Sequence, residues 1–132
     1  MYQVAQNSHD PRVFQLLVDA GADLDAVELF GATPLFNAVK AGNLVATQFF
    51  VEQGANAHHL DNRGNSVLHV AVGNCRKGGF IGERGIREKS ILEYLVQIGI
   101  DVAHPNDKGL SPIDIAKAKC GDPDVVGVLT DP

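Results

Sequence analysis

Apolar residues recur along the chain in three sets that share one internal spacing. Each set places apolar or small side chains at positions i, i+1, i+4 and i+5, which lie on one face of an α-helix. Each set is followed by a glycine, and glycine readily adopts the left-handed conformation that ends a helix. The pattern predicts helices that stop at Gly21, Gly54 and Gly99. The positions are Val13, Phe14, Leu17 and Val18; Ala46, Thr47, Phe50 and Val51; and Ile91, Leu92, Leu95 and Val96.

A shorter helix is predicted to precede each long one. The stretches 33–38, 66–71 and 111–116 each open on Thr or Ser, which are favoured N-cap residues. In two of them proline follows at the first helical position, where its missing N–H does no harm; Val67 stands there in the other. Asp10-Pro11 and Asp122-Pro123 predict the starts of two second helices, the last of which is expected from Val125 to Leu129.

Two series of glycines reveal an internal repeat. Thirty-three residues separate Gly21 from Gly54 and 45 separate Gly54 from Gly99, and the series Gly31, Gly64 and Gly109 has the same two intervals. A unit of 33 residues with 12 extra residues in one copy explains both. We divide the single domain 1–132 into a partial repeat 1–27, repeat two 28–60, repeat three 61–105 with an inserted loop at about 74–87, and a terminal repeat 106–132.

This combination of features resembles the ankyrin repeat. A 33-residue period, Thr33-Pro34-Leu35 opening a short helix and Gly21-Ala22-Asp23 closing a longer one carry the resemblance, which covers essentially the whole chain. It implies an all-α solenoid of helix-turn-helix units with hairpin turns, one unit carrying a 12-residue insertion. His69 is the one histidine at the position that the family usually fills with histidine; Phe36, Gln3 and Asp114 stand there in the other units. These departures bear on local hydrogen bonding at the hairpins rather than on the fold.

The resemblance also implies a partner-binding surface on the hairpin tips and the first helices. Such a surface is rigid, so binding costs little ordering entropy. Carried over by position, with Phe80 and Ile81 added from the inserted loop, the expected partner-binding residues are Val27, Leu29, Phe30, Ala32, Lys40, Leu60, Asn62, Arg63, Asn65, Phe80, Ile81, Asp107, Lys108 and Leu110. Asn7, Ser8, Ala41 and Lys119 hold related positions.

Two apolar features stand out among these candidates. Leu29 and Phe30 lie together at a hairpin tip, where polar residues are expected, so they form an apolar patch with Val27 and Leu60 or else fold back onto neighbouring turns. The inserted loop combines glycines and basic residues around Phe80-Ile81. It is a second contact site or a tolerated flexible insertion, because lengthening a surface loop costs little free energy.

Composition and charge argue against several other classes of function. The net charge of -5 disfavours nucleic acid, whose phosphates attract basic surfaces. No apolar run is long enough for a membrane span, and no signal peptide is visible. Cys75 and Cys120 match no zinc spacing, and read as two free thiols they suit a reducing compartment, with the cytoplasm as the expected location.

No cofactor, metal or enzymatic activity is expected. The glycines of the inserted loop lack the phosphate-binding motif and its preceding strand. His59 and His104 hold equivalent positions in neighbouring units but no carboxylate or thiolate cluster completes a metal site. Basic neighbours would lower the pKa of a Cys75 thiol, yet the repeat pattern places no histidine to activate it.

The sequence therefore favours a monomeric protein-binding module, a scaffold or adaptor. One alternative is a one-to-one inhibitor or protector of a single enzyme or toxin, for which an acidic concave face would suit a basic target. The other is an architectural segment of a longer ankyrin array, since both ends of the chain read as cuts through an array or as minimal caps.

Overall fold

The computed structural model describes residues 11–21, 23–28, 30–75, 82–120 and 123–130. Within these ranges all regular secondary structure is helical, and no helix there combines the length and apolar character needed to cross a bilayer. The helices are α2 (Pro11–Asp19), α3 (Pro34–Lys40), α4 (Leu44–Glu52), α5 (Val67–Gly73), α6 (Gly82–Gln97), α7 (Pro112–Lys119) and α8 (Pro123–Thr130).

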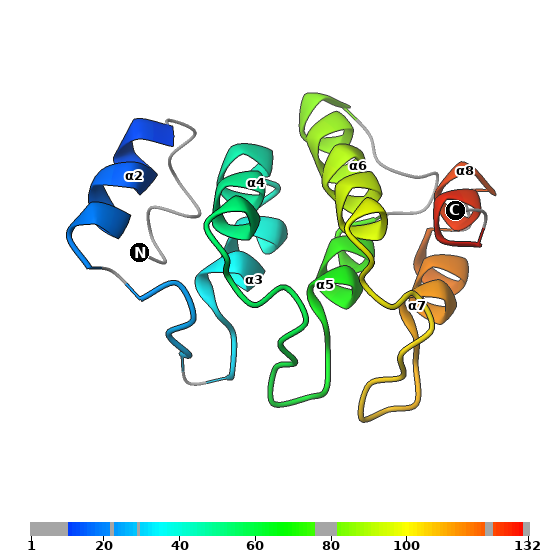
Figure 1. Ribbon diagram of the computed structural model, residues 1–132. Coiled ribbons are helices and arrows are strands. Elements are labelled where there is room, and N and C mark those ends of the chain that lie inside the picture. The colour runs from blue at the N-terminus through cyan, green and yellow to red at the C-terminus, as the bar shows by residue number, and fades with distance from the viewer. Residues whose placement is uncertain (1–10, 22, 29, 76–81, 121–122, 131–132) are drawn as a thin grey trace.

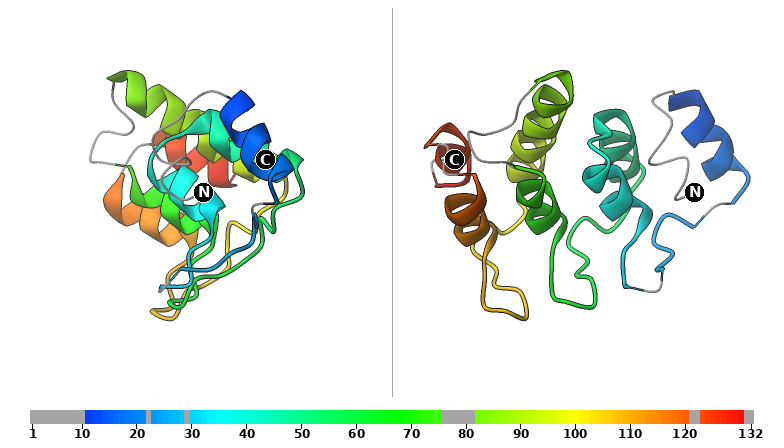
Figure 2. Two further views of the ribbon diagram at one scale, coloured as in Figure 1. Left: turned by 90° about the vertical axis from the view of Figure 1, so that its left-hand side faces the viewer. Right: turned by 180° about the vertical axis from the view of Figure 1, so that it is seen from behind.

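The helices stack in two rows, as the predicted solenoid requires. The shorter helices α3, α5 and α7 pack against one another in sequence, and the second helices α2, α4, α6 and α8 form another row, which lies above them in Figure 1. The connecting hairpins project together from one side of the stack (Figure 1), and the side view shows them nearly superimposed (Figure 2). The all-α solenoid expected from the repeat pattern is confirmed.

The hydrophobic core runs between the two rows. Its largest fully buried side chains include Leu35 and Leu68 from the first row and Phe50, Leu92 and Leu95 from the second. The last three were predicted from the i, i+1, i+4, i+5 pattern. Each repeat buries its apolar face only against its neighbours, so truncating a residue such as these to alanine should cost roughly 2–5 kcal/mol.

The predicted helix stops are confirmed. Gly21, Gly54 and Gly99 have φ of 89°, 91° and 95°, in the left-handed region that only glycine enters without strain. Starts are set by side-chain caps at several helices. In α4, for example, the Asn43 Oδ1 accepts a hydrogen bond from the Ala46 N–H at 3.1 Å.

The inserted segment departs from the prediction. The prediction of a loop over about 74–87 is wrong for its second half, because α6 begins at Gly82 and runs for 16 residues. The reason lies in the sequence from Glu83 to Lys89, where unbranched charged residues favour helix and outweigh the single Gly85. Phe80 and Ile81 lie outside the described residues. The last helix, Pro123–Thr130, is also longer than predicted.

The prediction of two free thiols is wrong as well. Cys75 and Cys120 form a disulfide, with their Cα atoms 5.4 Å apart. Their sequence separation of 45 equals the length of the enlarged repeat, so the two cysteines occupy equivalent positions that stacking brings side by side. The two cysteines therefore give no support to the prediction of a reducing compartment.

Candidate partner-binding site

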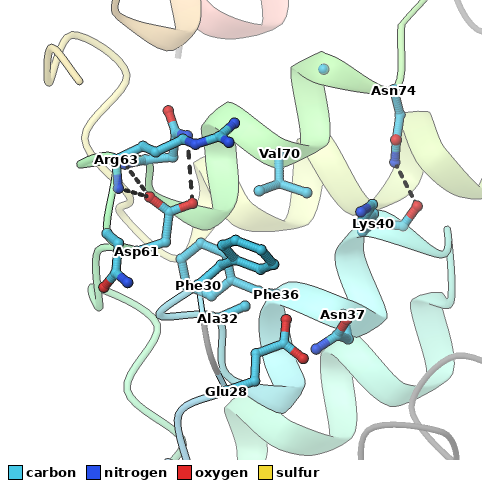
Figure 3. A pocket seen from close by; sticks show the side chains of 13 residues that line it. Glu28, Phe30, Ala32, Phe36, Asn37, Lys40, Asp61, Arg63, Val70 and Asn74 are labelled. Carbon is cyan, nitrogen blue, oxygen red and sulfur yellow. Dashed lines mark hydrogen bonds between the residues drawn. The ribbon is translucent and has the colours of Figure 1, made fainter. Parts of the chain in front are cut away.

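A groove of about 440 Å³ opens where the hairpin and first helix of repeat two meet those of repeat three (Figure 3). Its walls combine aromatic, amide and charged side chains. The lining residues are Glu28, Phe30, Ala32, Phe36, Asn37, Lys40, Asp61, Asn62, Arg63, Asn65, Val70, Gly73 and Asn74. Six of the sequence-predicted binding residues are thus brought together: Phe30, Ala32, Lys40, Asn62, Arg63 and Asn65.

Backbone hydrogen bonds hold the two hairpins against each other along one edge of this groove. The Asn62 N–H donates to the Phe30 carbonyl at 3.1 Å, and the equivalent Asp107 N–H donates to the Arg63 carbonyl at 3.0 Å. Gly31 makes the close approach feasible, because a Cβ at that position would lie 2.7 Å from the Asn62 backbone nitrogen. The spacing of the hairpins therefore depends on a glycine that the repeat arithmetic had already marked.

Aromatic and aliphatic side chains form the apolar part of the groove. Phe30 is 66% exposed, whereas Phe36 is buried and Val70 half-buried. The Phe36 ring meets His59 edge-on, with ring centroids 5.9 Å apart, and the His59 Nε2 donates to the Gly31 carbonyl at 2.9 Å. Phe36 is thus fixed from behind, while Phe30 offers its ring to solvent beside it (Figure 3).

Two of the polar groups in the groove serve the fold. Asp61 Oδ1 accepts from the N–H groups of Arg63 and Asn65, both at 2.9 Å, which shapes the repeat-three hairpin. Asn74 donates to the Val39 and Lys40 carbonyls at 3.1 and 3.3 Å, which caps the end of α3. These contacts keep the walls of the groove in place.

The groove also contains three charged side chains. Glu28, Lys40 and Arg63 are exposed, and their charged ends make no hydrogen bond or ion pair with other described residues. The Asp61 carboxylate accepts hydrogen bonds from its own hairpin. Leaving it aside, the charged side chains of the groove are two cations, Lys40 and Arg63, and one anion, Glu28.

Charges of both signs lie on the hairpin side of the stack. The described connections between repeats and the first helices carry the basic residues Lys40, Arg63, Lys108, Lys117 and Lys119 and the acidic residues Asp23, Asp25, Glu28, Asp61, Asp101, Asp107 and Asp114. Asp114 also accepts hydrogen bonds from the Ser111 backbone N–H, at 3.0 Å, and hydroxyl, which lower the pKa of its carboxyl. Acidic residues therefore outnumber basic ones among the described residues on this side of the stack.

The other predicted binding residues that the structure describes do not line the groove. Val27 and Leu60 are 55% and 40% exposed. Asp107, Lys108 and Leu110 belong to the last hairpin, where the Leu110 carbonyl accepts from His69 Nε2 at 2.9 Å. Leu29, Phe80 and Ile81 are not among the described residues.

Sequence reasoning missed several lining residues, chiefly Phe36, Val70 and Asn74. Asn74 had a usable signal, because it lies 33 residues after Ala41, a position already expected to face a partner. Phe36 and Val70 belong to α3 and α5, and the order of apolar residues along a short helix does not separate positions that line a groove from positions in the core. Among the described residues no cluster of three or more His, Cys, Asp or Glu side chains is placed to hold a metal ion.

Comparison with known proteins identifies the family. The ankyrin-repeat family, as three copies of the repeat, matches residues 1–80. The chain is 31% identical over 117 residues to the mouse B-cell lymphoma 3 protein homolog (88% of this chain, 23% of that protein) and 33% identical over 92 residues to mouse protein phosphatase 1 regulatory subunit 27 (70% and 52%). It is 30% identical over 124 residues to a putative ankyrin repeat protein of fowlpox virus (93% and 33%).

The chain spans about half or less of the length of these relatives. Ankyrin repeats are in general protein-interaction modules, and the family is typically not catalytic. The repeat arithmetic, the two rows of helices and the matched segment agree, and the chain belongs to the ankyrin-repeat family.

Proposed function

We propose that this chain is a protein-binding module that holds a partner against the groove between repeats two and three. The observation that carries the proposal is Phe30, a large aromatic side chain 66% exposed at the mouth of a concave site. Exposed aromatic groups beside a pocket are typical of the few residues that supply most of the free energy of protein binding.

The surroundings of Phe30 support this role. Its own backbone carbonyl is fixed by the bond from Asn62, and the neighbouring hairpin is shaped by Asp61, so the aromatic ring projects from an ordered turn. A site that is ordered before binding loses little conformational entropy when the partner arrives.

The partner that best complements the groove is a peptide segment with an apolar anchor and an adjacent carboxylate. The anchor would pack on Phe30, Phe36 and Val70. The carboxylate would pair with the ammonium of Lys40 or the guanidinium of Arg63, both of which line the groove and are exposed. Pairs of this kind chiefly speed association and select between partners, since their net contribution to affinity is small.

Affinity capture with a matched control tests the proposal. Phe30→Asp removes the exposed ring from the groove, and Leu16→Asp removes an equally exposed apolar side chain, 69% exposed, from α2 on the other row. Partners captured by the wild-type chain are identified, purified and titrated against all three proteins by calorimetry. We expect Phe30→Asp to weaken binding at least tenfold, as for an interface hot spot, and Leu16→Asp to leave it unchanged.

Equal affinity of all three proteins would refute the groove as the binding site. A partner lost with Leu16→Asp alone would place the interface on the second-helix row. If no partner binds any of them, the chain is better explained as an architectural segment of a longer array. Circular dichroism of the three proteins must agree for these comparisons to hold.

A second candidate function is regulation of a single enzyme by one-to-one binding. It is favoured by the likeness to a protein named as a phosphatase regulatory subunit. If the captured partner is an enzyme, its activity is measured against increasing concentrations of this chain. Saturation at one equivalent with loss of activity supports a regulator, and unchanged activity supports an adaptor.

A further inference from the structure

The disulfide between Cys75 and Cys120 lies at a junction of the stack. Cys75 follows Asn74, the residue that ends α5, and Cys120 is the residue that ends α7. The bond therefore joins the ends of two neighbouring first helices, and it lies where the chain leaves α5 for the inserted segment of repeat three. Both cysteines are almost fully buried, at 2% and 1% exposure.

Noncovalent contacts also tie the last repeat to its neighbour, through the packing of α7 on α5 and through hydrogen bonds that include the one from the Asn106 Nδ2–H to Asn65 Oδ1 at 2.9 Å. The hairpin is held by the Asp107 N–H on the Arg63 carbonyl and by His69 Nε2 on the Leu110 carbonyl. At the other end of α7, beside the disulfide, the exposed Lys119 ammonium donates to the Gly73 carbonyl at 2.8 Å. Ile113 and Ile115 of α7 are only half-buried.

We propose that the Cys75–Cys120 bond is a redox-dependent clamp that fixes the last repeat, α7 and α8, onto repeat three. In a stack each unit is stabilised only by its neighbours, so a covalent bond between two adjacent units strengthens the junction between them directly. Cross-linking the last repeat to the preceding unit restricts the opened state, in which the last repeat would otherwise detach. Reduction removes that restriction and leaves two buried thiols that make no covalent contribution.

The chemistry is ordinary thiol–disulfide exchange with a small-molecule disulfide such as oxidised glutathione. The thiolate of one cysteine attacks a sulfur of oxidised glutathione, which forms a mixed disulfide and releases one glutathione thiolate. The second cysteine thiolate then attacks the protein-bound sulfur and displaces the second glutathione. The two protons of the protein thiols end on two molecules of reduced glutathione, so the protein is oxidised by two electrons and glutathione is reduced by two.

Burial controls the rate of this exchange. A reductant reaches neither sulfur while α5 and α7 stay packed, because the attacking thiolate must approach along the sulfur–sulfur axis. Exchange therefore requires local opening of the last repeat, and the oxidised clamp slows its own reduction. The state of the clamp decides whether the last hairpin, with Asp107, Lys108 and Leu110, is held in register with the groove.

The test measures the last repeat in the two redox states of the full chain. The protein is equilibrated in oxidised or reduced glutathione, and its free thiols are counted by alkylation and mass spectrometry. Amide hydrogen exchange is then followed across α3, α5 and α7, together with thermal unfolding. A Cys75→Ala, Cys120→Ala double variant is treated in the same way as the matched control.

In the oxidised form we expect at least tenfold slower amide exchange in α7, no change in α3, and a Tm higher by on the order of 10 °C. The double variant should respond to neither glutathione condition. The proposal is overturned if alkylation shows both thiols free in oxidised glutathione. It is equally overturned if the bond forms but α7 exchanges at the same rate in both states.

Discussion

The hairpins and first helices of repeats two and three hold equivalent positions but are built from different interactions. In repeat three, the Ser66 hydroxyl accepts from the His69 N–H and the His69 Nδ1 accepts from the Ser66 N–H at 3.0 Å, which closes a capping box at the start of α5. In repeat two, Thr33 makes no side-chain cap, and its buried hydroxyl oxygen has no hydrogen-bond partner among the described residues.

The same contrast extends to the turns. Asp61 accepts two backbone N–H bonds within the repeat-three hairpin, whereas Glu28, at the equivalent position, makes no such bond. Repeat two replaces these polar bonds with aromatic packing, since Phe36 stands where repeat three has His69. Repeat two has fewer of these local polar bonds than repeat three, and it also exposes Phe30. Residues selected for partner binding rather than for stability would produce this difference.

The largest effect should come from the glycines between hairpins. Gly31→Ala places a Cβ 2.7 Å from the Asn62 nitrogen and adds left-handed strain, so we expect a loss of about 3 kcal/mol in the free energy of unfolding. Gly109 has a similar φ of 76° but open space around it, so Gly109→Ala should lose only about 1 kcal/mol. Urea unfolding of both variants gives the comparison, and equal losses would mean that hairpin contact contributes nothing.

Exchanging the two aromatic residues should come next. His69→Phe leaves the Ser66 N–H and the Leu110 carbonyl without their partner, and we expect it to cost about 2 kcal/mol. Phe36→His should cost less, because a histidine there regains a partner for the start of α3. Chemical denaturation measures both. A larger loss for Phe36→His would show that its packing outweighs the capping difference between the repeats.

A smaller effect should separate the two N-caps. Ser66→Ala removes a capping hydroxyl and should lower the free energy of unfolding by about 1 kcal/mol. Thr33→Val replaces an unpaired buried hydroxyl with a methyl group of similar size, so its stability should be unchanged or slightly higher. Thermal melts of the two variants decide the point, and a clear destabilisation by Thr33→Val would contradict the unpaired state of that hydroxyl.

The smallest effect should be a dependence on pH. Burial lowers the pKa of His69 below its ordinary value of 6.5; the nearby His104 also lowers it, while the bond to the Leu110 carbonyl and the charge of Asp61 oppose the shift. The unfolded chain then binds the proton more readily, so the stability that His69 contributes is complete above pH 6.5 and declines as the pH falls. Melting the wild type and His69→Phe at several pH values should show a shallower decline in the variant.

The fold could be predicted from the sequence because its signals are local and repeated. Gly54 and Gly99 stop helices, Ser66 and Ser111 start them, and each signal occurs more than once at a fixed interval. The groove was foreseen only in part. Phe30 and Arg63 follow from their place in the repeat, but Val70 lines the groove because of how α5 is rotated, which a one-dimensional pattern does not encode.

The disulfide shows a second limit of sequence reasoning. Forty-five residues between Cys75 and Cys120 match no cysteine motif, although the same number is the length of the enlarged repeat. Equivalent positions in a stack become neighbours in space, so distance along the chain was the wrong measure of proximity. The start of α6 at Gly82 is hard to predict for another reason. The glycines around it favour a loop, whereas the charged residues that follow favour a helix.

The bonds between successive hairpins have a mechanical consequence. Two successive junctions are each crossed by a backbone bond of the same kind, from Asn62 to Phe30 and from Asp107 to Arg63. A force that pulls the two ends of the stack apart loads these junctions in series, so each carries the full tension and the weakest separates first. With Cys75 and Cys120 joined, tension on the last junction passes through a covalent bond. The junction between repeats two and three, beside Phe30, should then separate before the last one does. Its separation would disrupt the groove and weaken the binding of a partner held there.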